Sequence, residues 1–163
     1  MNPHDVLRYA DRTFRRAIDT LEPADWLRVV AGVWTPKDVV GHVSAIHLLS
    51  VSALATFAGE PAPPAEQGLA DDVDFNMSQA AVRGAWPVER VVSEYEAAQA
   101  NLRRLAKAVD DETWQRVGTI PWYGPEYSLE DLIVYRVYGH VREHATHLGL
   151  AIDLRTGAVG GVA

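Results

Sequence analysis

Three histidines lie close together in the segment YGHVREHATHL near the end of the chain. They are His140, His144 and His147. Residues three and four apart are neighbours on a helix, so these imidazole rings form one stripe along its surface. Neutral imidazole is the commonest protein ligand for zinc and related metals, and a pair at positions i and i+4 is a candidate metal clip. The same spacing suits buried histidines that are satisfied by hydrogen bonds, and both interpretations stay open.

The helix that carries these histidines is predicted to span residues 128–153. Ser128 is a good capping residue, and acids follow in the first turn, where they favour the positive end of the helix dipole. Apolar residues recur along the helix at its own period, which places the histidine stripe on or beside the buried face. They are Ile133, Val137, Val141, Leu148 and Ala151.

A fourth histidine, His42, lies in the apolar stripe of a helix predicted at residues 36–58. His47 follows five residues later, about 140° round the helix, and is expected to point elsewhere. When the helix rise is counted from each end, antiparallel packing against the last helix brings His42 nearest to the level of His140 and His144. These three rings can therefore meet in the interior.

The remaining apolar periodicity completes an all-α fold. We predict helices at residues 3–21, 36–58, 88–109 and 128–153, with a short helix at 74–83. The connection 59–87 is long enough to run the length of the bundle, which predicts a four-helix bundle in an up-down-down-up arrangement with a long crossover between helices two and three. Residues 110–127 are expected to form a loop rich in aromatic residues. The chain is interpreted as one domain, 1–163, with a flexible tail at 156–163.

Composition narrows the function classes. The 163 residues are 48% hydrophobic and 23% charged, with a formal net charge of -7 and a pI of about 5.3. No run of lysine and arginine is present to follow a phosphate backbone, so nucleic-acid binding is not expected. We see no signal-peptide core and no apolar run near the ~20 residues of a membrane span, so a cytoplasmic protein without membrane contact is expected. The chain has no cysteine, so any thiol chemistry uses a thiol brought by a substrate.

Two motifs and a short segment carry a resemblance to a known family. The stretch WTPKDVVGHV, which ends one residue after His42, resembles the second-helix motif of the DinB/YfiT-like superfamily, and YGHVREHATHL resembles its last-helix motif. Asp74-Phe75-Asn76 resembles a short aspartate–asparagine segment between the second and third helices. The resemblance implies a four-helix bundle that holds one divalent metal ion on His42, His140 and His144. It places His147 beside a ligand.

The resemblance also implies a range of functions. The superfamily includes thiol-dependent S-transferases, the metal-binding N-terminal domain of mycothiol-dependent maleylpyruvate isomerase and proteins classed as metal-dependent hydrolases. This sequence ends after the bundle, so isomerase activity is not expected. Three imidazoles leave a coordination position open, as catalytic sites do. We expect a metal-dependent enzyme acting on small molecules, foremost an S-transferase with a low-molecular-weight thiol as cosubstrate. A hydrolase, or a stress protein that binds a metal or small molecule without turnover, is the alternative.

Several finer points stay open at this level. Imidazole ligands suit zinc, nickel, copper and iron, and we favour zinc or nickel. Asn76 can orient a substrate or cap a turn. Glu94, Glu143 and Tyr138 are candidate hydrogen-bond partners of the histidines, although Glu143 is expected to point ~100° away from His144, towards the surface. Residues available to form a pocket wall are Trp34, Trp122 and Tyr123. The adjacent valine pairs Val39/Val40 and Val91/Val92 suggest a homodimer through a helical face.

Overall fold

The computed structural model describes residues 2–61 and 73–158, and its regular structure is helical. The helices are α1 (Pro3–Asp19), α2 (Pro36–Phe57), α3 (Val73–Gly84), α4 (Val88–Ala106), α5 (Asp111–Gln115), α6 (Leu129–Leu132) and α7 (His140–Thr156). A 3₁₀ turn, η1 (Asp25–Leu27), precedes α2, and a π-helical segment, η3 (Ile133–Gly139), joins α6 to α7. Within the described ranges the only β-type pairing is an isolated bridge between Ala31 and Trp34. The prediction of an all-α fold is confirmed.

The helix starts follow the local capping chemistry. The Asn2 side chain accepts hydrogen bonds from the backbone N–H groups of His4 and Asp5 and so caps α1. At α2 the capping box is complete, because Thr35 caps the Asp38 N–H while the Asp38 carboxylate accepts from the Thr35 N–H at 2.9 Å. Ser128 begins α6 with the same reciprocal pair of bonds. The caps at Thr35 and Ser128 fix where α2 and the continuous helical segment from α6 to α7 begin.

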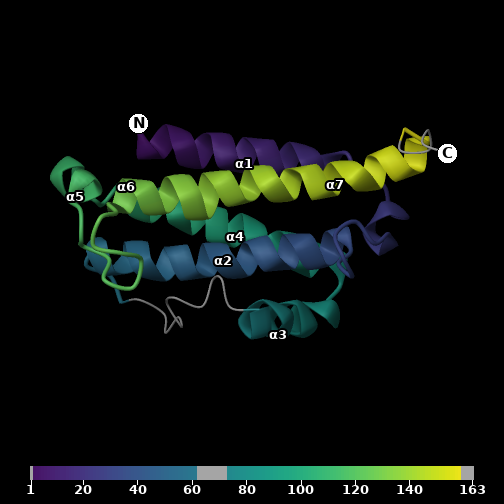
Figure 1. The fold of residues 1–163 in the computed structure, drawn as a ribbon, viewed down its shortest axis with the longest axis horizontal. Helices are drawn as coiled ribbons and strands as arrows, with labels where there is room; N and C mark the ends of the chain where they lie inside the picture. The colour runs from purple at the N-terminus through teal and green to yellow at the C-terminus, as the bar shows by residue number, and fades with distance from the viewer. Residues whose placement is uncertain (1, 62–72, 159–163) are drawn as a thin grey trace.

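Figure 1 shows the four long helical segments side by side. Helix α1 and the segment from α6 to α7 run in one direction, while α2 and α4 run in the other. This is the expected up-down-down-up arrangement. Helix α3 packs against α2. Helix α2 is therefore antiparallel to α7, which is the packing that helix rise favoured for bringing His42 to the level of His140 and His144.

Helix α2 forms the centre of the core. Its length and mean hydropathy of 1.6 are enough for a membrane span, but 89% of that apolar window is buried inside the bundle. We interpret α2 as a buried core helix. This run was not predicted from the sequence, because serines and histidines interrupt it. Val39, Val40 and Val91 are also fully buried, so these valines offer no surface for the expected homodimer.

Two local predictions were wrong. Residues 110–127 contain the helix α5, which forms because Asp110 caps the Thr113 N–H and Trp114 is buried against the core. The predicted last helix is not α-helical throughout, since the His140 N–H donates to the Tyr135 carbonyl, five residues back. This wider π-type turn is common at functional sites. Helix α7 extends to Thr156, and residues 159–163 of the expected tail lie outside the described residues.

Candidate metal centre

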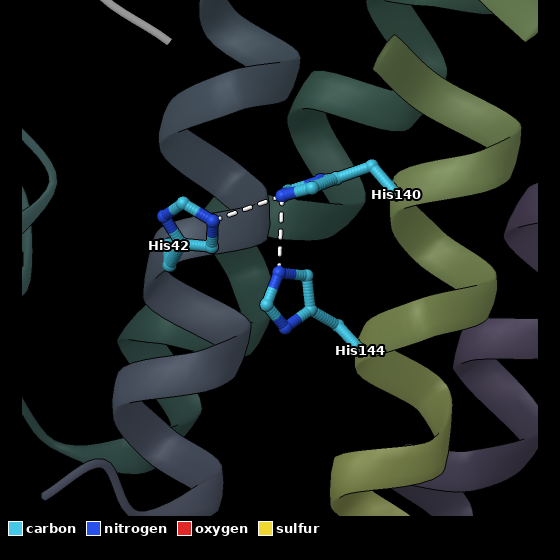
Figure 2. Close-up of side chains that lie close together, drawn as sticks. All are labelled: His42, His140 and His144. Carbon is cyan, nitrogen blue, oxygen red and sulfur yellow. Dashed lines mark hydrogen bonds between the residues drawn. The ribbon is translucent and has the colours of Figure 1, made fainter. Parts of the chain in front are cut away.

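Three imidazole nitrogens from two antiparallel helices converge at one point. Figure 2 shows His42 on α2 facing His140 and His144 on α7. The Nε2 atoms of His42 and His140 are 2.9 Å apart, and those of His140 and His144 are 3.0 Å apart. Candidate ligand atoms of all three residues lie within 4.8 Å of one another. The structure therefore brings together the three predicted ligands.

The arrangement of these nitrogens fits a metal ion better than a hydrogen-bond network. A ring nitrogen in the plane of an imidazole offers either one proton or one lone pair. The His140 Nε2 faces two other nitrogens, so it can form a good hydrogen bond with only one of them. Around a tetrahedral zinc-like ion, ligand nitrogens at ~2.0–2.1 Å lie about 3.3 Å apart. Rotations of the side chains would direct all three lone pairs to one cation.

The surroundings keep all three rings neutral. Burial, followed by the charge of Arg83, lowers the pKa of His42 to about 4. Burial followed by the neighbouring histidines lowers the pKa of His140 to about 2 and that of His144 to about 3. A metal ligand must be deprotonated, and at neutral pH these nitrogens have their lone pairs available. The cluster can hold a metal ion.

The three rings form part of the wall of an open cleft of about 740 Å³. Asn76 from α3 and Tyr123 from the loop after α5 line it. Of the other predicted wall residues, Trp34 packs against His42 with ring centroids 4.9 Å apart, and Trp122 lines a separate small cavity. The cleft's remaining lining residues are Ile46, Tyr127, Tyr135, Arg136, Gly139 and Glu143.

Comparison with known proteins bears on this site directly. The family model of the DinB superfamily matches residues 7–148, which include every residue of the histidine cluster. The chain belongs to the DinB superfamily. No curated protein and no solved structure matches it. Proteins of the DinB superfamily often bind metal ions, and in this member three of the four histidines in the two motifs, His42, His140 and His144, converge.

His147 lies beside the cluster of this DinB protein but outside the converging group. Its Nδ1 is 3.1 Å from the Nδ1 of His144. If His144 presents Nε2 to an ion, its Nδ1 carries the proton and can donate it to His147. Hydrogen bonds of this kind fix the orientation and tautomer of a ligand. The position predicted for His147, next to a ligand, agrees with this contact.

Other predicted partners of the histidines are engaged elsewhere. Glu94 forms two hydrogen bonds with Arg83, at 2.5 and 3.0 Å, and Tyr138 packs under Arg142. Glu143 is an exception, because it lines the cleft, whereas the sequence predicted that it points towards the surface, away from His144. Among the described residues, no hydrogen-bond partner is present for the buried Nδ1 atoms of His42 and His140.

His47 points to another part of the core, as its angle from His42 predicted. Its Nδ1 lies 3.3 Å from Gln99 Nε2, and its ring packs against Tyr95. Burial, followed by the effect of His42, lowers its pKa to about 3. His47 therefore belongs to a buried polar group behind the cluster.

A buried arginine connects α3 to the helix that carries His42. Arg83 is 4% exposed, and its guanidinium donates to Glu94 on α4 and to the Gln79 side chain on α3 at 2.8 Å. Its aliphatic part packs on Gly41, the residue before His42, where an added Cβ would lie 2.9 Å from Arg83 Cδ. This contact was not predictable from the sequence, because the residues that take part in it come from three separate helices.

Proposed function

We propose that this protein is a divalent-metal-dependent enzyme that acts on small molecules, and that its reaction is the transfer of a low-molecular-weight thiol to an electrophile. The observation that carries the proposal is the convergence of His42, His140 and His144 on the wall of an open cleft. Three protein ligands leave a position for a substrate, whereas structural sites are closed by four.

Each part of the site has a task in this reaction. A bound divalent ion would supply a Lewis acid that favours the thiolate form of the nucleophile at neutral pH. The three neutral histidines hold that ion, and the chain has no cysteine to compete with the substrate thiol. The rings of Tyr123, Tyr127 and Tyr135 offer an apolar wall on which an electrophile can lie next to the nucleophile. Holding the two reactants together supplies a further part of the acceleration.

The proposal is tested first by elemental analysis of the purified protein, and then with a panel of thiols and electrophiles. We expect about one zinc or nickel ion per chain. Conjugation should stop on chelation, return with added zinc or nickel, and fall steeply in His42→Ala. A conjugation rate indifferent to both chelation and His42→Ala would eliminate the mechanism and favour a binding protein without turnover.

A second candidate, metal-dependent hydrolysis, is favoured by one observation. The Glu143 carboxylate lines the cleft close in sequence to both His140 and His144, and a carboxylate there can accept a proton from an attacking water. Release of product from ester or amide substrates without any thiol would support this reaction over S-transfer. For either reaction we propose a cytoplasmic protein whose partners are small molecules.

A further inference from the structure

Two side chains of opposite charge line the cleft on either side of His140. Arg136 lies four residues before His140, in the π-helical segment, and Glu143 lies three residues after it, on α7. The other lining residues are histidines, tyrosines, an asparagine, an isoleucine and a glycine. Within the described part of the chain, these two residues supply all the formal charge of the cleft wall at neutral pH.

The positions of both charges are set by the helix. Seven residues of helical rise separate them by roughly 10 Å along the axis, with His140 between them. The Arg136 guanidinium packs over the ring of Tyr123, 5.5 Å from its centroid, and cation–π packing of this kind restricts where the guanidinium can lie. The Glu143 side chain is exposed, so its carboxylate can turn towards a ligand in the cleft.

This charge pattern selects a ligand class. A guanidinium binds a carboxylate through two parallel hydrogen bonds, and a carboxylate binds an ammonium group through a charge-assisted one. A ligand with both groups close to a sulfur atom can use Arg136, Glu143 and the histidine cluster together. An α-amino-acid thiol has this arrangement, because its three functional groups are carried on adjacent carbon atoms.

We propose that the thiol substrate is an α-amino-acid thiol, whose carboxylate binds Arg136 and whose ammonium group binds Glu143 while the sulfur faces the three histidines. This inference rests on the proposed S-transfer function and narrows its substrate. It makes Arg136 and Glu143 residues that determine specificity.

The test measures binding to the zinc-loaded protein by calorimetry, so its readout does not depend on turnover. The four probes are cysteine, cysteamine, 3-mercaptopropionate and 2-mercaptoethanol, which carry both charged groups, the amine alone, the carboxylate alone, or neither. We expect cysteine to bind at least about ten-fold more tightly than 2-mercaptoethanol, as one or two charge-assisted hydrogen bonds provide.

Two variants separate the contributions of the two charges. Glu143→Gln should weaken the binding of cysteine and cysteamine by about ten-fold and leave the binding of 3-mercaptopropionate unchanged. Arg136→Gln should instead weaken the binding of the two carboxylate-bearing thiols, cysteine and 3-mercaptopropionate. The amine of a probe could also bind the zinc ion directly, but that contact would persist in Glu143→Gln. A loss of affinity in this variant is therefore attributable to the missing carboxylate. Arg142→Gln is the matched control, since Arg142 lies on α7 and packs against Tyr138. Zinc content and the melting temperature should equal those of the wild type in all three variants.

The outcomes distinguish this inference from the proposed function. Equal affinity for the four thiols, or an equal loss for all four in Glu143→Gln, would overturn the inference and leave S-transfer standing. If none of the four thiols bound the zinc-loaded protein, S-transfer and the inference would both fall.

Discussion

Replacing Gly41 by alanine tests how the buried arginine holds the helix that carries His42. In an exposed helix this change stabilises the fold by about 1 kcal/mol, because glycine has the higher backbone entropy in the unfolded chain. Here the new Cβ would lie 2.9 Å from Arg83 Cδ and 3.3 Å from Arg83 Cβ. The Arg83 side chain cannot easily move away, since its hydrogen bonds to Glu94 and Gln79 hold the guanidinium in the interior.

Overpacking of this kind costs roughly 1–3 kcal/mol, which meets or exceeds the gain in helix propensity. We therefore expect Gly41→Ala to lower the free energy of unfolding by up to about 2 kcal/mol in the wild-type background. In an Arg83→Ala background, the Cδ contact is gone and only the milder Cβ contact remains. There the same substitution should be neutral or stabilising by up to about 1 kcal/mol.

The four proteins of this double-mutant cycle are compared by urea unfolding monitored by circular dichroism, without added metal. A coupling energy of at least ~1 kcal/mol is expected for residues in direct contact. Zinc affinity is measured in parallel, because Gly41 precedes His42 and a shift of α2 moves that ligand. If Gly41→Ala stabilised both backgrounds to the same extent, the close packing of Arg83 on α2 would be wrong.

Three further predictions address the histidines and the assembly. His147→Ala should keep metal stoichiometry but weaken zinc binding about 10–100-fold, because His144 loses its hydrogen-bond partner; the same affinity as in a His4→Ala control would contradict this role. His47 has a pKa lowered by burial to about 3, so stability should fall as the pH drops below ~6.5, where the unfolded chain takes up a proton that the native state does not. Urea titrations should show that metal-free His47→Gln loses less free energy of unfolding between pH 6.5 and pH 5 than the wild type does, by up to about 2 kcal/mol. An equal loss of stability in the two proteins would refute the lowered pKa of His47. A homodimer stays a prediction, and light scattering that gives the monomer mass at micromolar concentration would remove it.

The sequence was sufficient to predict the long helices and the histidine cluster because both depend on local rules. Capping at Thr35 and Ser128 and the apolar repeat of the last helix are features of neighbouring residues. His140 and His144 follow from a spacing of four, and His42 required only the direction of packing. Helix α5 was missed because it is a single short turn that depends on burial of Trp114, a tertiary contact.

The rest of the cleft was not predictable by the same rules. The position of Glu143 was judged by its angle from His144 alone, whereas it also lies three residues after His140 and so faces the same opening. Tyr135 lines the cleft, and its carbonyl accepts a hydrogen bond from the His140 N–H, five residues later, in the π-type turn. This turn changes the angular position of the residues around the helix, which an ideal α-helical period does not predict. The partners of Arg83 lie on other helices, and no periodic pattern connects them.

The histidine cluster also has a physical cost that points to function. Three imidazoles occupy positions at or beside a core that is built mainly from aliphatic and aromatic side chains. One Nε2 faces two others and can bond to only one of them, and two buried Nδ1 atoms have no partner within the described residues. Leaving a buried polar atom unpaired costs about 1–3 kcal/mol, and apolar side chains at these positions would avoid that cost. Local conflicts of this kind are expected where a chain keeps residues for chemistry. A cation that accepts three lone pairs resolves the conflict among the Nε2 atoms, and this supports a metal centre over a set of packed core histidines.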